Sequence, residues 1–315
     1  MKNYHRLETL ILRTPTNSLS QLEKLQDLSL LMKDKSFLEA LYISIPALYN
    51  DIKRYDEITD KKKLKKITES IYKFYCRMCT RPTPYGLFAT CGTLKIDNET
   101  NINLEEPKLF IKNIRLDMNF LCALSQSLEK DTEIRKSLKF FPNSSIYSLQ
   151  ESYRYIEYKY KDSSRNHFLS AVPKNEYLEK IFKLAASNGA SIDELTNCII
   201  DNEISREDAY DFVVELILNQ LLISELEPTV LTGDFLVNII EIISKIPVAN
   251  EICETLIDIQ QTINDINKTQ IGIDTEIYET LIKKIETLDI GIDRGKLFQL
   301  DYSNTTIQSS LINKN

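Results

Sequence analysis

A long helical pattern in the first third of the chain ends at a proline-rich turn. Between Leu64 and Met78 apolar residues recur at steps of three and four, which marks a single buried face of a helix. Asp60 is placed to accept hydrogen bonds from the first backbone N–H groups of this helix. Pro82 ends the pattern, because the residue before a proline is disfavoured in the α region. The sequence therefore predicts a helix that begins after Asp60 and ends before Pro82.

Two arginines close this predicted helix and precede a stiff turn. Arg77 and Arg81 are four residues apart, so they are expected on one face, and Lys73 extends the row by one turn. The turn holds the Thr83 hydroxyl between two prolines, and Gly86 then permits a backbone conformation that other residues resist. Guanidinium groups bind phosphate or carboxylate through two parallel N–H donors. The simpler alternative is that both arginines only stabilise the negative end of the helix.

The remainder of residues 1–139 alternates between strand and helix patterns. Asp117 is well placed to cap the last helix of this segment. In chain order we predict a strand Leu7–Arg13, helices Leu22–Lys33 and Ser36–Tyr49, strands Thr90–Ile96 and Leu109–Leu116, and a helix Met118–Leu128.

Residues 140–226 show strands followed by short helices. Ser191 and Ser205 each precede a helix and have an acidic residue three positions later, as in a capping box. A ribbon, a helix–turn–helix and a closing strand together make the layout of a winged helix. The strands are Ser145–Leu149, Tyr153–Lys161 and Phe168–Val172, the helices are Glu176–Asn188, Ile192–Asp201 and Ser205–Leu221, and Leu221–Leu226 closes the unit.

Winged helices often bind DNA, but the charge of this segment argues against that use. Residues 144–226 contain eight Lys or Arg and fourteen Asp or Glu, a net charge of −6. The last predicted helix begins with Arg206, Glu207 and Asp208, so it would be a poor neighbour for phosphates. We therefore expect no DNA partner.

The last segment, residues 227–315, is mostly helical and ends in a short strand. Helices are predicted over Gly233–Lys245, Asn250–Asn267 and Thr275–Leu288, followed by the strand Leu297–Asp301. This strand is expected to be an unpaired sheet edge, which favours association. The first of these helices also carries more isoleucine than one buried stripe requires. We therefore expect a complementing chain or a homo-oligomer.

Composition narrows the class of protein further. The chain has 315 residues and a net charge of −7, which suits about two globular domains and disfavours general nucleic-acid binding. No apolar run is long enough to span a membrane, and Met1–Leu10 lacks a signal-peptide core, so a cytoplasmic location is expected. Cys76 and Cys79 form a lone C-x-x-C, and with only two histidines no metal site is expected.

The order Arg77-x-x-x-Arg81-Pro82-Thr83-Pro84-Tyr85-Gly86-Leu87-Phe88-Ala89 resembles the signature of the lantibiotic dehydratases, near the start of their N-terminal glutamylation domain. The segment Phe37–Pro46 is also similar, although Ile45 separates the serine from the proline. The resemblance implies an enzyme that moves glutamate from glutamyl-tRNA onto Ser and Thr of a precursor peptide. Elimination of the glutamate then leaves dehydroalanine or dehydrobutyrine.

The resemblance also implies a fold. It is α+β, with a helix-rich portion of the glutamylation domain and an inserted winged-helix-like module that binds the leader peptide of the precursor as an added strand. In these terms residues 1–139 are the N-terminal part of the glutamylation domain, residues 140–226 are the peptide-binding module, and residues 227–315 continue the glutamylation domain.

Site residues follow from the same resemblance. Arg77, Arg81 and Thr83 would contact the tRNA acceptor end or the glutamyl ester, while Asp117 and Asp301 would orient the attacking hydroxyl or the glutamyl amine. Glutamyl-tRNA would be a co-substrate, and no other cofactor is implied. Arg115 is also predicted to contact substrate, close to the site arginines and aspartates. Further substrate contacts are predicted in the peptide groove, through Tyr153, Tyr155 and Tyr158. Those tyrosines have an alternative role, which is to cover a half-buried sheet.

The sequence leaves two questions open, which are the role of the lysine run and the absence of an elimination domain. The run from Lys61 to Lys66 is the densest charge in the chain; it is either a solvated helix face or a contact for the phosphate backbone of tRNA. Family members are several times longer, and no counterpart of their elimination domain is found here. We expect a split or truncated dehydratase, and the alternative is a non-catalytic protein that binds a leader peptide and delivers the precursor to other enzymes.

Overall fold

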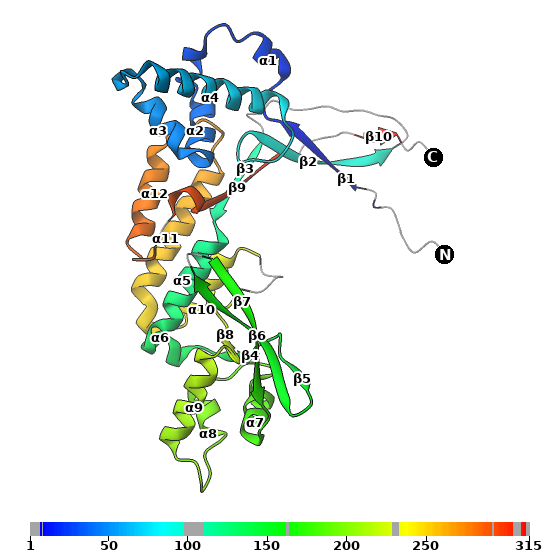
Figure 1. Ribbon diagram of the computed structural model, residues 1–315, viewed down its shortest axis with the longest axis vertical. Helices are drawn as coiled ribbons and strands as arrows, with labels where there is room; N and C mark the ends of the chain where they lie inside the picture. Colours follow the sequence, from blue (N-terminus) through cyan, green and yellow to red (C-terminus); the bar gives the residue numbers. More distant parts are fainter. Residues whose placement is uncertain are drawn as a thin grey trace. The chain divides into compact units, whose positions relative to one another are not determined.

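The computed structural model describes residues 7, 9–97, 110–161, 164–228, 233–291, 293–304 and 310–312 (Figure 1). The chain mixes helices with strands, as the sequence predicts, and divides into two compact units. The first contains Met1–Phe120 and Ile257–Asn315, and the second contains Leu121–Leu256. None of the described helices is long and apolar enough to cross a membrane.

The first unit is built on a mixed sheet with the strand order β1-β2-β9-β3. β1 is antiparallel to β2, β9 is parallel to β2, and β3 is antiparallel to β9, while the short β10 also pairs with β2 in parallel. The strands are β1 Thr9–Pro15, β2 Ala89–Asp97, β3 Ile111–Leu116, β9 Phe298–Asn304 and β10 Ser310–Ile312.

The position of β9 corrects one prediction. The strand predicted over Leu297–Asp301 was expected to be an unpaired edge, but β9 lies inside the sheet between β2 and β3. Its pairing with β3 runs from Ile111 opposite Ser303 to Leu116 opposite Phe298. Both partner strands come from far earlier in the chain, so the hydrophobic pattern around β9 held no information about them. The strand is therefore paired, with β3 from Phe298 to Ser303 and with β2 at Ser303 and Asn304, and the expected association stays a prediction.

Side chains alternate across this sheet, which gives it a buried and an exposed face. In β3 and β9, Ile114, Leu116 and Tyr302 are at most 4% exposed, and the residues between them face outward. The helices of this unit are α1 Leu19–Glu23, α2 Lys35–Ser44, α3 Pro46–Lys53, α4 Lys61–Thr80 and α12 Glu276–Glu286, with short 3-10 turns η1 Leu28–Leu30, η2 Tyr55–Glu57 and η5 Arg294–Lys296. α5 Met118–Lys130 and α11 Asn250–Asn267 each extend from one unit into the other.

Two predicted helices are interrupted by local chemistry. The helix expected over Leu22–Lys33 is reduced to α1 and η1, where the Asp27 side chain accepts a hydrogen bond from the Ser29 N–H and competes with helical pairing. The helix expected over Ser36–Tyr49 is split at Ile45, whose φ of −145° and ψ of 66° lie outside the α region because Pro46 follows. Pro46 then starts α3, where it needs no backbone N–H.

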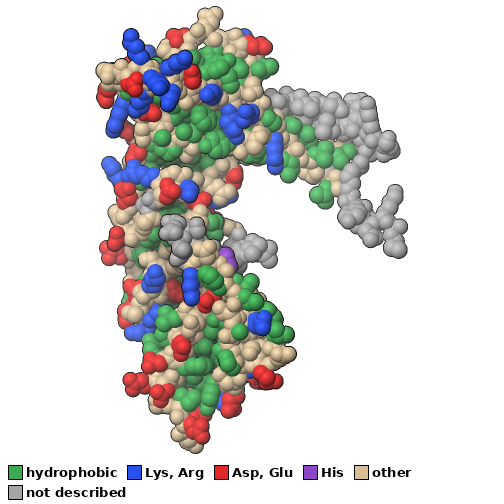
Figure 2. Space-filling view, in the orientation of Figure 1, with side chains coloured by type: hydrophobic (Ala, Val, Ile, Leu, Met, Phe, Trp, Pro, Cys, Tyr) green, Lys and Arg blue, Asp and Glu red, His purple; other side chains and the backbone are tan. Residues whose placement is uncertain are grey.

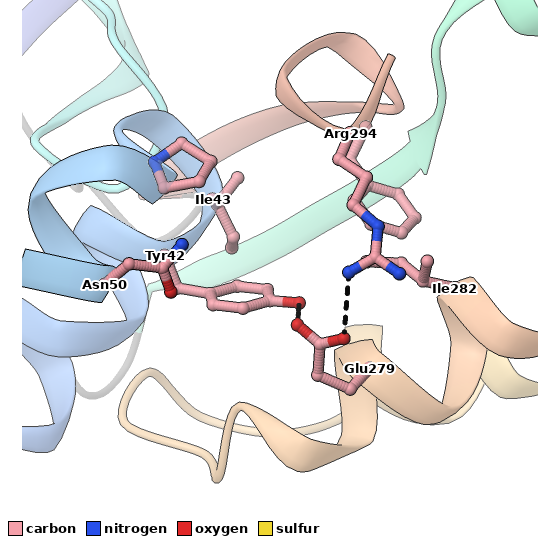
Figure 3. Close-up of a pocket in the computed structure, with 8 residues that line it drawn as sticks. Tyr42, Ile43, Asn50, Glu279, Ile282 and Arg294 are labelled. Atoms are coloured by element: carbon pink, nitrogen blue, oxygen red, sulfur yellow. Dashed lines mark hydrogen bonds and ion pairs between the residues drawn. The ribbon is translucent and has the colours of Figure 1, made fainter. Parts of the chain in front are cut away.

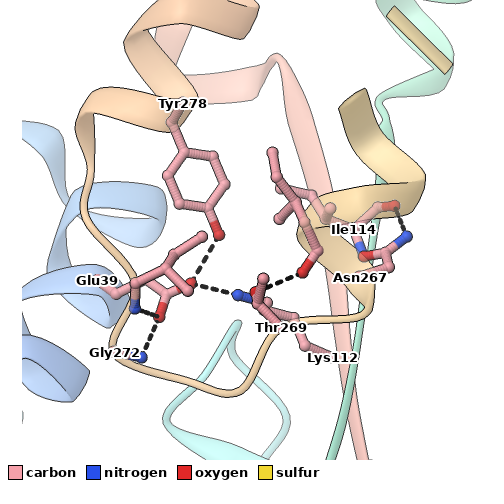
Figure 4. A network of polar contacts seen from close by, with 9 residues as sticks. Glu39, Lys112, Ile114, Asn267, Thr269, Gly272 and Tyr278 are labelled. Atoms are coloured by element: carbon pink, nitrogen blue, oxygen red, sulfur yellow. Dashed lines mark hydrogen bonds and ion pairs between the residues drawn. The ribbon is translucent and has the colours of Figure 1, made fainter. Parts of the chain in front are cut away.

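A buried ionic network ties α2 and α12 to the sheet (Figure 4). The Glu39 carboxylate and the Lys112 ammonium are fully buried, and their N···O distance is 2.7 Å. Glu39 also accepts hydrogen bonds from the Tyr278 hydroxyl at 2.7 Å and from the backbone N–H groups of Gly272 and Ile273. Burial lowers the pKa of Lys112, and the charge of Glu39 opposes that shift. One carboxylate therefore holds four donors from three parts of the unit.

The outer side of β3 is closed by a side chain. The Ile114 N–H donates to Asn267 Oδ1 at 2.7 Å, and Asn267 Nδ2 donates to the Ile114 carbonyl at 3.0 Å (Figure 4). An amide side chain thus replaces a neighbouring strand and satisfies both backbone groups of an edge residue.

The second unit follows the predicted order of ribbon, helices and closing strand. β5, β6 and β7 form an antiparallel ribbon, and β4 pairs with β8. Ser191 and Glu194 cap α8 reciprocally, and the Ser205 hydroxyl accepts from the Asp208 N–H at the start of α9. The strands are β4 Phe140–Pro142, β5 Tyr147–Leu149, β6 Ser152–Lys161, β7 Ser164–Pro173 and β8 Leu222–Ser224; the helices are α6 Thr132–Ser137, α7 Glu176–Ala185, α8 Ile192–Asn197, α9 Arg206–Leu218 and α10 Phe235–Ile243, with the 3-10 turn η4 Pro247–Ala249.

This unit is wider than the segment 140–226, because α5 packs against its closing strand. Ser125 Oγ donates to the Leu226 carbonyl at 2.6 Å, and Ser224 Oγ donates to Glu129 Oε2 at 2.5 Å. The assignment of residues 140–226 as a winged helix stays a prediction.

Glu129 gives this unit a testable pH dependence. Burial raises the pKa of its carboxyl above the ordinary value, against the opposing hydrogen bond from Ser224. A carboxyl whose pKa is raised on folding favours the folded state when protonated, and that advantage disappears as the pH rises through the raised value. We therefore expect Glu129→Gln to be more stable than the wild type at pH 7, with a difference that shrinks as the pH falls toward 4. Thermal melts across this range test the sign, with the exposed Glu254→Gln as a charge-matched control; a difference independent of pH contradicts it.

Candidate functional site

The first part of the site is the end of α4 and the turn that follows. Asp60 Oδ1 accepts from the Lys62 N–H at 2.8 Å and caps the helix start, as predicted. The helix ends at Thr80, and Arg81 is the C-cap with extended backbone angles, although its N–H still donates to the Arg77 carbonyl at 3.0 Å. Arg81 and Thr83 are exposed.

Tyr85 positions the guanidinium group of Arg77. Arg77 Cζ lies 4.7 Å from the centroid of the Tyr85 ring, which is a cation–π contact. The Tyr85 ring is stacked on Phe88, and its hydroxyl donates to the Ser44 carbonyl at 3.1 Å. Arg77 Nε is buried, and no described atom accepts a hydrogen bond from it. The ring contact therefore helps to place the guanidinium, and among the described residues no hydrogen bond or ion pair engages its outer nitrogens.

The turn itself is held in one conformation by packing on α2. Gly86 has a φ of +51°, which strains residues that have a Cβ, and a Cβ at this position would clash with Ser44 Oγ. Thr16 Oγ1 donates to the Leu87 carbonyl at 2.6 Å, and the Asn17 N–H donates to the Met78 carbonyl at 2.9 Å. These bonds fasten both ends of the motif to the chain just before α1.

The second part of the site lies on the exposed face of the sheet. Arg115 of β3 and Asp301 of β9 form an ion pair of 2.6 Å, with side chains 37% and 57% exposed. Arg115 is opposite Gln299 and Asp301 is opposite Asn113, so the two charged residues are diagonal neighbours on one face. The family resemblance implied both residues, and the structure brings them together across 186 positions of the chain.

Asp117 follows directly after this strand. Its Oδ1 accepts from the Asn119 N–H at 2.8 Å, which is the predicted capping contact at the start of α5. Its own N–H donates to the Leu297 carbonyl just before β9. Asp117 is half-buried; one of its carboxylate oxygens caps the helix, and the other accepts no hydrogen bond from the described residues.

The turn after α4 and the ion pair are connected to neighbouring strands of one sheet. The turn after α4 leads straight into β2, where Cys91 is opposite Ser303 of β9. Ser303 is two residues beyond Asp301, so their side chains share a face of the sheet. Among the described residues no hydrogen bond or ion pair joins the α4 arginines to the pair formed by Arg115 and Asp301.

The three predicted tyrosines lie on β6, the middle strand of the ribbon. Tyr155 is 4% exposed and belongs to the core. The Tyr158 hydroxyl donates to Glu227 and accepts from Gln126 Nε2, so it is already engaged. Tyr153 is half-buried against Phe182 at 5.4 Å between ring centroids. Of the three, Tyr153 and Tyr158 reach the surface in part, and Tyr155 supports the sheet from within.

The described residues also line a small cavity near α2 and α12 (Figure 3). Its volume is about 70 Å³, enough for a few water molecules. The Tyr42 hydroxyl donates to Glu279 at 2.7 Å, and Arg294 is paired with Glu279 and Glu286. Because these charged groups neutralise one another, the cavity is a poor candidate for a substrate site. Within the described ranges, no group of three His, Cys, Asp or Glu side chains is placed to hold a metal ion.

Sequence reasoning did not assign a role to Tyr85 beyond the motif or any role to Ser44 and Asn267. Tyr85 lies eight residues after Arg77, and its contact depends on the bend at Pro82 and Pro84. The sequence predicts the bend, but it does not predict that the bend brings the Tyr85 ring back to Arg77.

Comparisons with known proteins bear on the fold and the family of the chain. Over 97% of its length the chain resembles the crystal structure of the tRNA dependent lantibiotic dehydratase MibB from Microbispora sp. 107891, with a TM-score of 0.74 and 16% identity, and it covers 29% of that chain. It also resembles the glutamylation domain of TbtB from thiomuracin biosynthesis, with a TM-score of 0.61 and 15% identity, over 90% of this chain and 34% of that one. At these identities the likeness shows the fold alone.

The sequence relatives are proteins of lantibiotic biosynthesis. The chain is 27% identical to the subtilin biosynthesis protein SpaB of Bacillus subtilis over 82% of its own length and 25% of the relative. It is 28% identical to the nisin biosynthesis protein NisB of Lactococcus lactis subsp. lactis over 91% of its length and 28% of that protein. The chain thus spans between a quarter and three tenths of the curated relatives it matches.

The fold and the motif place the chain among peptide-dehydratase proteins. The family model described as "Lantibiotic dehydratase, N terminus" matches residues 33–312, so the chain belongs to that family.

Proposed function

We propose that this chain provides the glutamylation part of a peptide dehydratase, transferring glutamate from glutamyl-tRNA to Ser and Thr side chains of a precursor peptide. The observation that carries the proposal is the Arg77–Ala89 motif, in a chain whose residues 33–312 match the lantibiotic dehydratase N terminus. In this motif Arg77 is held over Tyr85 at the end of α4, with its outer nitrogens facing no described partner.

The proposed reaction is an ester exchange. The hydroxyl oxygen of the peptide Ser or Thr attacks the glutamyl carbonyl, the bond between that carbonyl and the terminal ribose oxygen breaks, and the hydroxyl proton ends on the ribose oxygen. Arg77, Arg81 and Thr83 hold the ester and the terminal phosphates and stabilise the developing oxyanion. Asp117 and Asp301 orient the attacking hydroxyl or the glutamyl amine, and Arg115 fixes Asp301 at 2.6 Å.

The second unit supplies a site for the leader peptide. In the strand order β5-β6-β7, β7 is an outer strand, and its Phe168 and Leu169 are 48% and 60% exposed. The opposite edge of β6 is occupied, because Gln220 exchanges two hydrogen bonds with the Tyr158 backbone. A peptide strand added at β7 satisfies the open backbone groups and covers the two apolar side chains.

A second candidate function rests on that edge alone. A chain that binds a leader peptide at β7 and delivers the precursor to other enzymes needs no glutamyl transfer. It requires only the ribbon, whose β7 edge is ten residues long.

Transfer of labelled glutamate from glutamyl-tRNA to the precursor peptide tests the first function, with the chain alone and with the product of a neighbouring gene. Removing both arginines, in Arg77→Ala with Arg81→Ala, should lower transfer by at least about 100-fold, because oxyanion donors contribute on that scale. The exposed Arg206→Ala is the matched control and should transfer normally. Activity that persists in the double variant refutes these roles, and leader-peptide binding without any transfer favours the second function.

A further inference from the structure

The exposed face of α4 carries a row of cations that leads to the candidate site. With 100° between successive residues, Lys62, Lys66, Lys73 and Arg77 fall within one narrow stripe of the helix. The three lysines are exposed, and the buried residues Ile67, Ile71 and Tyr75 occupy the other side of the helix. At 1.5 Å per residue the row from Lys62 to Arg77 is about 22 Å long. Figure 2 shows Lys and Arg side chains gathered over the part of the first unit where α4 lies.

The positions of these lysines destabilise the helix. Lys61, Lys62, Lys63, Lys65 and Lys66 all lie in the first six residues of α4, at the positive end of its dipole. Lysines at positions 62 and 66 are four apart and repel each other, as are those at 61 and 65. Such an arrangement lowers helix stability, and an external anion bound along the row would offset the repulsion.

Internal partners do not supply that anion. Lys63 pairs with Asp51 at 3.1 Å, while the ion pairs of the described residues include none for the lysines at 62, 66 and 73. The Asp60 carboxylate caps the helix start, and the acid within α4 is Glu69. α4 as a whole holds six lysines and Arg77 against the single acid Glu69, although the chain carries a net charge of −7.

We propose that this row, Lys62, Lys66 and Lys73, is a track for the sugar–phosphate backbone of an RNA whose end lies at Arg77. The proposal rests on the proposed function, in which Arg77 meets the acceptor end of glutamyl-tRNA. A line of point charges contacts successive phosphates without reading bases, so the track binds RNA by charge and shape. It brings the acceptor stem along α4 toward the Pro82–Gly86 turn.

Binding of fluorescently labelled tRNA to the full chain, measured by anisotropy at several salt concentrations, tests the track. Lys62→Gln, Lys66→Gln and Lys73→Gln together should weaken binding on the order of 10- to 100-fold near 0.15 M salt. The slope of log affinity against log salt should fall by about 2, since each phosphate contact contributes roughly 0.7 to 0.9. The control removes the same charge from exposed lysines of the second unit, Lys130, Lys183 and Lys245, and should change binding little.

The melting temperature separates this result from misfolding. The α4 variant relieves repulsion within the helix, so its melting temperature should equal or exceed that of the wild type. The track is wrong if the α4 variant binds tRNA as the wild type does, if the control set loses as much, or if the wild type binds no tRNA. Binding to anionic phospholipid vesicles that competes with tRNA would assign the lysines to a membrane surface instead.

The glutamyl-transfer assay distinguishes failure of the tRNA track from failure of the proposed transfer function. With both correct, the α4 variant raises KM for glutamyl-tRNA and leaves kcat near the wild-type value, because the track contributes uniform binding. Normal transfer with unchanged KM in the variant rejects the track and leaves the function. Lysine-dependent tRNA binding without any transfer rejects the function and leaves the track.

Discussion

Replacing Glu39 with alanine should destabilise the first unit by about 3–5 kcal/mol, the scale on which breaking a buried ion pair acts. The variant leaves the Lys112 ammonium buried without its counter-charge, since both side chains are fully buried in the wild type. It also removes the acceptor for the Tyr278 hydroxyl and for the backbone N–H groups of Gly272 and Ile273. Each donor left without a partner adds its own desolvation cost.

The two partners of this ion pair should not be equivalent. Lys112→Met removes one donor, and the Glu39 carboxylate keeps three others, so the loss should be smaller than for Glu39→Ala. Combining both changes should recover part of the stability lost in Glu39→Ala, because the double variant no longer buries an unpaired ammonium.

Urea unfolding followed by circular dichroism and tyrosine fluorescence measures these differences, since the chain has sixteen tyrosines and no tryptophan. Glu133→Ala removes the exposed partner of Lys136 and is the control for a surface pair, with an expected change within about 1 kcal/mol. Equal losses in Glu39→Ala and Lys112→Met would show that the carboxylate does not organise the network.

Asp301→Asn and Arg115→Gln should each lower glutamyl transfer on the order of 100-fold and leave stability almost unchanged. The ion pair is partly exposed, at 37% for Arg115 and 57% for Asp301, so its contribution to folding is at most about 1 kcal/mol. Its contribution to transfer is larger, because a carboxylate that orients a reacting group acts in the transition state.

The double variant distinguishes a joint role from two separate ones. If Arg115 serves to position Asp301, the double variant should lose no more transfer than either single variant, since the second change removes nothing further. Multiplicative losses would show that the two residues act independently. Unfolding curves of the same proteins serve as the control, and a large loss of stability would assign the pair a structural role instead.

The local features of the site were predictable from the sequence. Asp60, the apolar stripe of α4 and Pro82 fix where that helix begins, which face it buries and where it ends. Gly86 takes the positive φ that the motif predicted. The bounds of the helix, its buried face and the conformation of the turn depend on residues close together in the chain. The local sequence pattern therefore contains their physical causes. The same holds for the ribbon and helices of the second unit, whose caps at Ser191 and Ser205 were visible as residue spacings.

Contacts between segments that are distant in the chain could be found only from the tertiary structure. The sequence supplied Arg115 and Asp301 as separate candidates, and only the pairing of β3 with β9 makes them neighbours. β9 pairs with β3 from Phe298 to Ser303 and with β2 at Ser303 and Asn304, and its local pattern indicates neither partner. A lysine at an inward position of β3 marks Lys112 as unusual, yet its partner Glu39 is 73 residues away, and no periodicity points to it. The local alternation of apolar and polar residues and the capping residues determine which face of a strand or helix each side chain lies on. The long-range packing of strands and helices determines which side chains contact one another.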